Sequence, residues 1–155
     1  MSTFVGPHEG RELQLMMAGE KPLSMFFEPV QSEFECFPEE QFDVLVAEGR
    51  LVKNVSFEDI KAPDGNDVQM RRVAYALPGE EWRIKAILLV QDLYDSLVPG
   101  WRPDLDRVIG LLLGYQREDI EDFVQSLGLH AADEHTVPHP AATRSVEGAK
   151  SVHRE

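Results

Sequence analysis

The sequence predicts an α+β fold: a small antiparallel four-stranded sheet packed on helices, with a helical hairpin towards the C-terminal end. Two observations predict this fold. Segments with the pattern of strands come in pairs, and a turn-forming cluster separates the two members of each pair. Segments with a helical period lie before, between and after these pairs. The predicted order of elements is α-ββ-α-ββ-α-αα. Because each pair of strands is joined by a short turn, the two strands are expected to pair antiparallel.

The first half of the chain contains two predicted helices and two predicted strands. Residues 9–18 carry apolar side chains at helical spacing and are followed by Gly19, a residue common at helix C-termini. Residues 22–28 (PLSMFFE) are predicted to form a strand, and residues 32–36 (SEFEC) alternate with a strand's period of two. Residues 38–49 begin with proline, continue with acidic residues and end with glycine, which is typical of a short helix.

The second half contains the longest predicted helix. Residues 51–57 and 68–77 are predicted strands on either side of the turn cluster KAPDGND. A helix is expected over residues 80–98, and its main apolar stripe comprises Trp82, Ala86, Leu89, Leu93 and Leu97. Further apolar residues lie on its other sides, and a helix that is apolar nearly all round is usually covered on more than one side. We therefore expect it to lie between the sheet and a final helix pair over 104–113 and 117–127.

One folded domain and a tail are predicted. Residues 1–129 contain all the predicted helices and strands and are long enough to form one hydrophobic core. Residues 130–155 are rich in Ala, Ser, Thr, His and Pro, with valine as the only large aliphatic residue. Such a segment buries too little apolar area to offset the entropy of ordering, so it is expected to be disordered.

Charge is the strongest feature of the composition. The chain has 28 acidic and 15 basic residues and a net charge of −13, and residues 22–49 contain seven acids and no base. Such a field repels phosphates and anionic lipids and attracts basic surfaces. We therefore expect a basic protein partner and neither nucleic acid nor membrane. The alternative is that the acidity only keeps a small protein soluble.

The predicted helix pair resembles a DNA-reading helix-turn-helix in geometry but not in charge. Gly110, Gly114, Ile120 and Phe123 have the spacing that such a pair needs. The second helix, however, exposes four acids and a single base, Arg117; the acids are Glu118, Asp119, Glu121 and Asp122. Recognition helices need basic or amide side chains in the groove, so the pair is interpreted as a structural hairpin.

Few residues suggest catalysis. Four of the five histidines fall in the predicted tail, the single cysteine gives no zinc pattern, and no phosphate-binding or hydrolase motif occurs, so no metal or cofactor is expected. An enzyme or a small-anion-binding protein using Arg11, Glu12 and Lys21 remains the alternative, because these residues flank one short predicted helix. The main concentration of bases is expected to pair with neighbouring carboxylates; it comprises Arg71, Arg72, Arg83 and Lys85.

These observations favour a binding protein over an enzyme, with an adaptor, inhibitor or immunity-type role. The chain starts without the pattern of a secretory leader and its longest aliphatic run, residues 86–90, is too short to span a bilayer, so a cytoplasmic location is expected. The oligomeric state stays open. The residues predicted to contact the partner are Glu33, Glu35, Glu39, Glu40, Asp43, Glu118, Asp119, Glu121 and Asp122. They are expected to form one broad acidic surface if both segments fold onto one face.

Overall fold

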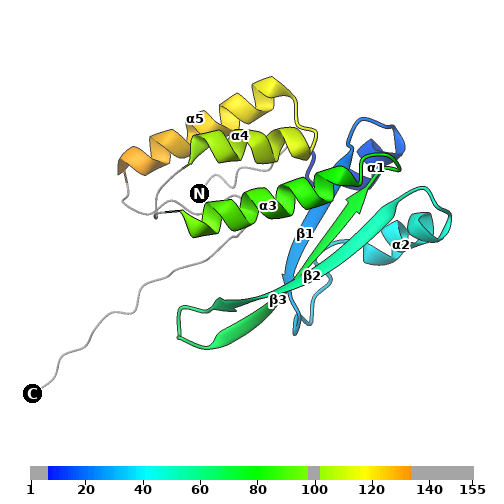
Figure 1. Cartoon of the computed structure of the whole chain (residues 1–155), viewed down its shortest axis with the longest axis horizontal. Coiled ribbons are helices and arrows are strands. Elements are labelled where there is room, and N and C mark those ends of the chain that lie inside the picture. Colours follow the sequence, from blue (N-terminus) through cyan, green and yellow to red (C-terminus); the bar gives the residue numbers. More distant parts are fainter. Residues whose placement is uncertain (1–6, 98–101, 134–155) are drawn as a thin grey trace, which may run out of the picture.

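The computed structural model describes residues 7–97 and 102–133 and has an α+β architecture (Figure 1). Its elements follow the order α1, β1, α2, β2, β3, α3, α4, α5. The strands are β1 (Leu23–Pro29), β2 (Val52–Lys61) and β3 (Asp67–Ala76). The helices are α1 (Glu12–Met17), α2 (Glu39–Ala47), α3 (Trp82–Ser96), α4 (Pro103–Leu112) and α5 (Arg117–Asp133).

In the described part of the chain the sheet has three strands in the order β1-β3-β2, and both pairs are antiparallel. β2 and β3 form a hairpin whose turn contains Gly65 at a φ of 86°, a conformation that favours glycine. The register aligns Glu28 of β1 with Arg71 of β3, and Arg71 with Phe57 of β2. These three side chains therefore lie on one row across one face of the sheet.

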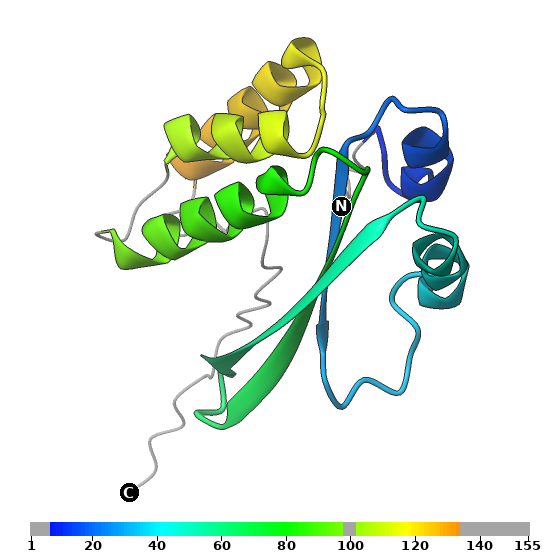
Figure 2. The same ribbon diagram turned by 45° about the vertical axis from the view of Figure 1, so that its right-hand side comes forward.

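Helices cover both faces of the sheet (Figure 2). α1 and α2 lie against one face, and α3, α4 and α5 lie on the other side. β3 is the central strand, and its side chains alternate between the two layers: Val73 and Tyr75 belong to the core under α1 and α2, and Ala74 and Ala76 belong to the core under α3 and α4. This alternation of buried residues on both faces explains why the second half of β3 reads as a continuous apolar run.

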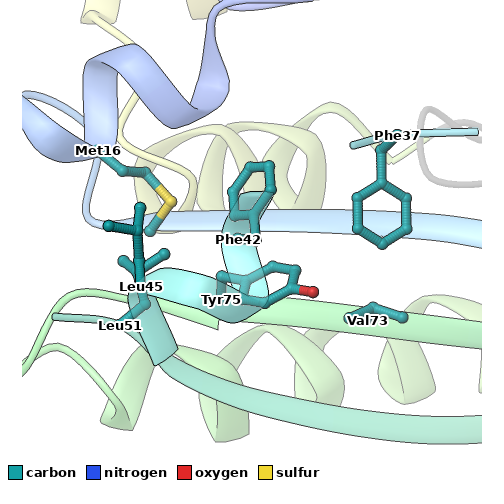
Figure 3. Close-up of a cluster of buried hydrophobic side chains, with 7 residues drawn as sticks. All are labelled: Met16, Phe37, Phe42, Leu45, Leu51, Val73 and Tyr75. Carbon is teal, nitrogen blue, oxygen red and sulfur yellow. The ribbon is translucent and has the colours of Figure 1, made fainter. Parts of the chain in front are cut away.

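The core under α1 and α2 combines aromatic rings with Met16 and aliphatic side chains (Figure 3). The rings of Phe26 and Phe37 stack with centroids 4.1 Å apart, and Phe42 lies 4.6 Å from Tyr75. Tyr75 is fully buried, but its hydroxyl donates a hydrogen bond to Asp43 Oδ1 at 3.0 Å. A buried tyrosine hydroxyl usually has such a partner, and this bond ties α2 to the sheet.

The core under α3 and α4 is aliphatic. It contains Leu23 and the two alanines of β3, with Ile84 and Ile87 of α3 and Ile109 and Leu112 of α4. The small alanine side chains leave room for these larger residues of the helices to pack on the strand. α4 in turn packs on α5, where an added Cβ on Gly110 would lie 2.7 Å from Cγ1 of Ile120.

The prediction of a fourth strand over residues 32–36 is wrong. This segment is exposed, and the structure describes it as bends without strand pairing. Ser32 Oγ accepts a hydrogen bond from the backbone N–H of Phe34 at 3.2 Å and donates one to the carbonyl of Phe34 at 2.9 Å. Such local side-chain bonds compete with strand pairing. Phe37, the residue that follows the predicted strand, enters the core.

Most of the main apolar stripe predicted for the longest helix does not face the core, although its member Ala86 packs against it. Its members Trp82, Leu89 and Leu93 are exposed, whereas α3 buries Ile84 and Ile87 against the sheet and α4. Because α3 is apolar on several sides, its sequence does not determine which side the sheet covers.

The chain stays helical past the predicted domain boundary. α5 continues to Asp133 and so includes residues 130–133, the start of the segment predicted to be disordered. The rest of the predicted tail, residues 134–155, lies outside the described residues.

Candidate functional site

A cleft of about 690 Å³ lies on the α2 side of the sheet. Its lining comes from the end of β1, the segment that leads to α2, the first turns of α2, and one residue each of β2 and β3. Six of the lining side chains are carboxylates: Glu28, Glu33, Glu35, Glu39, Glu40 and Asp43. The other charged residue of the lining is Arg71. The cleft is therefore strongly acidic and collects five of the nine residues predicted to contact a partner.

Arg71 joins the sheet floor of the cleft to α2. Its Nε donates to Glu28 Oε1 at 2.9 Å, its Nη1 donates to Glu39 Oε1 at 3.1 Å, and its Nη2 pairs with both carboxylates. The hydrogen bond from Arg71 holds the pKa of Glu39 below its usual value. The same interactions raise the pKa of Arg71 itself, so the cluster stays charged.

Lys53 of β2 forms a second link to α2. Its ammonium contacts Glu39 at 2.8 Å and Asp43 at 2.7 Å. These contacts raise the pKa of Lys53 above its usual value even though burial acts in the opposite direction. The charges of Glu39 and Asp43 are therefore largely compensated within the chain, although both residues were predicted to contact a partner.

The uncompensated charge lies on the rim of the cleft. Glu33, Glu35 and Glu40 are exposed and form no ion pair with any described residue. Between the first two, the side chain of Phe34 is 83% exposed, and Phe57 on the floor is 58% exposed. Two large aromatic side chains are thus accessible next to three free carboxylates, a combination of charge and apolar surface that is common at binding sites.

The second predicted acidic segment lies in the other layer. Glu118, Asp119, Glu121 and Asp122 belong to α5, on the opposite side of the sheet from α2 (Figure 2). Glu121 is paired with Arg107 of α4 through two hydrogen bonds of 2.8 and 2.9 Å. The two acidic segments therefore form two separate surfaces and not the one broad surface that was expected.

The three residues of the alternative prediction have different environments. Arg11 is exposed, whereas Lys21 is 2% exposed, and its ammonium donates to the carbonyl of Leu113 at the end of α4 at 2.9 Å. Burial lowers the pKa of Lys21 to about 8, although the charge of Glu12 acts in the opposite direction. In this position Lys21 connects the start of β1 to the C-terminal end of α4, where a positive charge is favourable.

His8 and Tyr115 complete the surroundings of Lys21, and sequence reasoning missed both. The Lys21 ammonium lies 3.1 Å from Nδ1 of His8 and 4.7 Å from the ring centre of Tyr115, and the rings of His8 and Tyr115 stack at 4.1 Å. His8 is more than 100 residues from Tyr115 in sequence, so no local pattern indicated their contact.

The predicted pairing of the basic residues is confirmed for three of the four. Arg71 contacts Glu28 and Glu39, Arg72 contacts Glu58, and Arg83 contacts Glu80. For Lys85, none of the described residues provides an ion pair. No group of three or more His, Cys, Asp or Glu residues is placed to hold a metal ion within residues 7–97 and 102–133.

Comparison of the chain with protein-family models, with curated proteins and with solved structures gave no match. None of the helices in the described residues is both long and apolar enough to cross a membrane.

Proposed function

We propose that this protein binds a basic segment of a protein partner in the cleft between α2 and the sheet. One observation carries the proposal: six carboxylates and two exposed aromatic side chains line the same cleft of about 690 Å³. Acidic residues alone would be compatible with a simple solubilising surface. The concave shape and the exposed rings of Phe34 and Phe57 favour a binding site.

The free carboxylates and the exposed aromatic residues of the cleft contribute to binding in different ways. The free carboxylates Glu33, Glu35 and Glu40 attract the partner during encounter and pair with its Lys or Arg side chains. Phe34 and Phe57 contact the aliphatic parts of these side chains or an adjacent apolar residue, and exposed aromatic rings also bind cations through their faces. Because rim charges mainly affect association and buried apolar contacts mainly affect dissociation, the two sets should act on different rate constants.

The ion pairs under the rim keep the cleft in shape. Arg71 and Lys53 connect α2 to the sheet and compensate part of the negative charge that would otherwise push α2 away. A pre-formed site of this kind avoids the entropy cost of ordering on binding. The adaptor, inhibitor and immunity-type roles all fit a small domain with such a cleft, and the negative field opposes binding to nucleic acid.

Affinity purification with charge-matched variants tests the proposal. The first bait carries Glu33→Lys, Glu35→Lys and Glu40→Lys, which removes the free carboxylates of the cleft. The control bait carries Glu118→Lys, Asp119→Lys and Asp122→Lys, which changes the net charge by the same amount in the other layer. Wild type and both variants are incubated with host extract at about 50 and 500 mM salt, and the recovered proteins are quantified.

We expect wild type and the control variant to retain a protein with a basic surface at low salt, and the cleft variant to lose it. Recovery of this protein should fall at high salt because the screening length is only about 4 Å at 500 mM. Equal loss with both variants would show that net charge, and not the cleft, attracts the partner. Equal recovery with all three baits would remove the proposal altogether.

A further inference from the structure

The side of α3 that faces away from the core is apolar and exposed. Leu89 is 68% exposed and Leu93 is 45% exposed, and Trp82 at the start of the helix is also exposed. Residues two apart on a helix point about 200° away from each other, so Leu89 and Leu93 point nearly opposite to the buried residues Ile87 and Gln91. A helix that is apolar on both sides but covered on one has a second side suited to burial.

Two charged residues flank this apolar side. Lys85 and Asp92 are exposed on the same flank of α3, and neither forms an ion pair with a described residue. Lys85 thereby differs from Arg71, Arg72 and Arg83, which all have carboxylate partners. The helix thus offers an unpaired cation and an unpaired anion on either side of Leu89 in the sequence.

We infer that a second copy of this chain docks on α3, with the two α3 helices antiparallel and related by a two-fold axis next to Leu89. Lys85 precedes Leu89 by four residues and Asp92 follows it by three. At a rise of about 1.5 Å per residue, Lys85 of one copy then lies almost level with Asp92 of the other copy and on the same side of the interface. Each contact occurs twice, as in any two-fold interface.

The charges select this arrangement over the others. A parallel pair would bring Lys85 level with Lys85 of the second copy and Asp92 level with Asp92, so the opposite charges would not meet. A basic partner would find one cation and no free acidic cluster on the apolar side itself. The antiparallel second copy is the occupant that both buries Leu89 and Leu93 and pairs Lys85 with Asp92.

The interface is expected to be small and to respond to salt differently from the cleft. α3 has 15 residues and is about 22 Å long, so the area buried by a single helix pair falls at the lower end for stable interfaces. The fraction of dimer should therefore depend on protein concentration.

Each copy carries a net charge of −13, which opposes association at low salt. Dimerisation should therefore persist or strengthen as salt increases, whereas binding at the cleft should weaken.

Sedimentation equilibrium of the full chain between about 10 μM and 1 mM tests the inference. Wild type should shift from monomer to dimer over this range, and Leu89→Asp should raise the dissociation constant at least about tenfold. The matched control is Val44→Asp, which changes an exposed aliphatic residue on α2 in the other layer and should leave the dissociation constant within about twofold. A chain that stays monomeric up to 1 mM, or a dimer that Leu89→Asp leaves intact, would overturn the inference.

Charge exchange tests the antiparallel register. Lys85→Glu alone places two acids side by side, and Asp92→Lys alone places two bases side by side, so each should weaken the dimer. The double variant Lys85→Glu with Asp92→Lys restores the pairing with opposite polarity and should recover most of the wild-type affinity. Additive weakening in the double variant would overturn the proposed register.

Cross-linking gives an independent test of direction. In a Cys36→Ser background, Leu89→Cys places a thiol next to the two-fold axis and should form a disulfide between copies under mild oxidation. Ser96→Cys lies seven residues from the axis and should not, because an antiparallel pair separates the two thiols by about 20 Å. Equal cross-linking at both positions would show a parallel pair and contradict the inference.

Discussion

Arg71 links two of the elements that line the cleft. It bridges Glu28 of β1 and Glu39 of α2, and its side chain is 26% exposed. Removing one partner of a partly buried ion pair leaves the other charge without compensation. Arg71→Met should therefore lower the free energy of unfolding by about 2–3 kcal/mol in urea denaturation.

The control for this prediction is Arg50→Met. Arg50 pairs with Glu48 at 3.4 Å, and about half of each side chain is exposed, so its removal should cost less than about 1 kcal/mol. Adding Glu28→Gln to Arg71→Met should recover part of the loss, because it removes the buried charge. Equal effects of the substitutions at positions 71 and 50 would show that Arg71 is an ordinary surface residue.

Lys21 should make stability depend on pH in the alkaline range. Its pKa is about 8 in the folded protein, below the usual value of 10.5, so between these pH values the unfolded chain binds more protons than the folded one. The free energy of unfolding therefore rises with pH through this window, by about 2 kcal/mol between pH 8 and 10. Lys21→Met should abolish this rise in denaturation curves measured at several pH values. A rise of the same size in the variant would assign it to another group.

Single residues of the cleft could be predicted from the sequence only where they were acidic and close together. Glu33, Glu35 and Glu40 stand out because no base lies between residues 22 and 49. Phe57 belongs to β2 and reaches the cleft through strand pairing with β3, a contact that charge and composition do not specify. Lys53 of the same strand reaches Glu39 and Asp43 in the same way. For Arg71, the sequence indicated a carboxylate partner but not which one.

At the scale of elements, Gly114 fixes how α4 approaches the start of β1. Its φ is 82°, and an added Cβ would lie 2.3 Å from Cδ of Pro22. Gly65 has a similar φ of 86° but nothing within 4 Å of such a Cβ. Gly65→Ala should cost about 1–2 kcal/mol from the backbone alone, and Gly114→Ala about 1–3 kcal/mol more because of overpacking. Similar losses of thermal stability in both variants would contradict the close packing of α4 on β1.

Elements with clear caps and turns at their ends were predicted better than elements whose position depends on tertiary packing. The segments that became α2 and β3 follow the predicted ranges because their caps, turns and periodicity agree, whereas β2 continues past its predicted end at Phe57 to Lys61. The predicted strand at residues 32–36 alternates correctly, but each strand also needs a partner, and Ser32 forms a local turn instead. For α3, several apolar sides compete, and the packing of α4 and the sheet decides which is buried.

In the whole molecule, the sheet lies between the acidic segments of α2 and α5, and the sequence did not indicate that they lie on opposite sides. α2 connects β1 to β2 on one face, and α5 follows α4 on the other (Figure 2). Which face of the sheet a helix covers depends on how the connecting segments cross the sheet. The spacing of apolar and polar residues within the helix does not specify this. The proposed partner site and the proposed dimer contact on α3 therefore lie in different layers and can be tested independently.

The rate of association with the partner recovered by affinity purification tests whether the cleft binds that partner. The rate is measured for wild type, for the Glu33, Glu35 and Glu40 variant, and for the charge-matched α5 variant, between about 50 and 500 mM salt. We expect a loss of about tenfold or more at low salt for the cleft variant and a change below about threefold for the α5 variant, and all three rates should converge at high salt. Equal losses in the two variants would contradict this expectation, because the cleft would then contribute nothing beyond its share of the net charge.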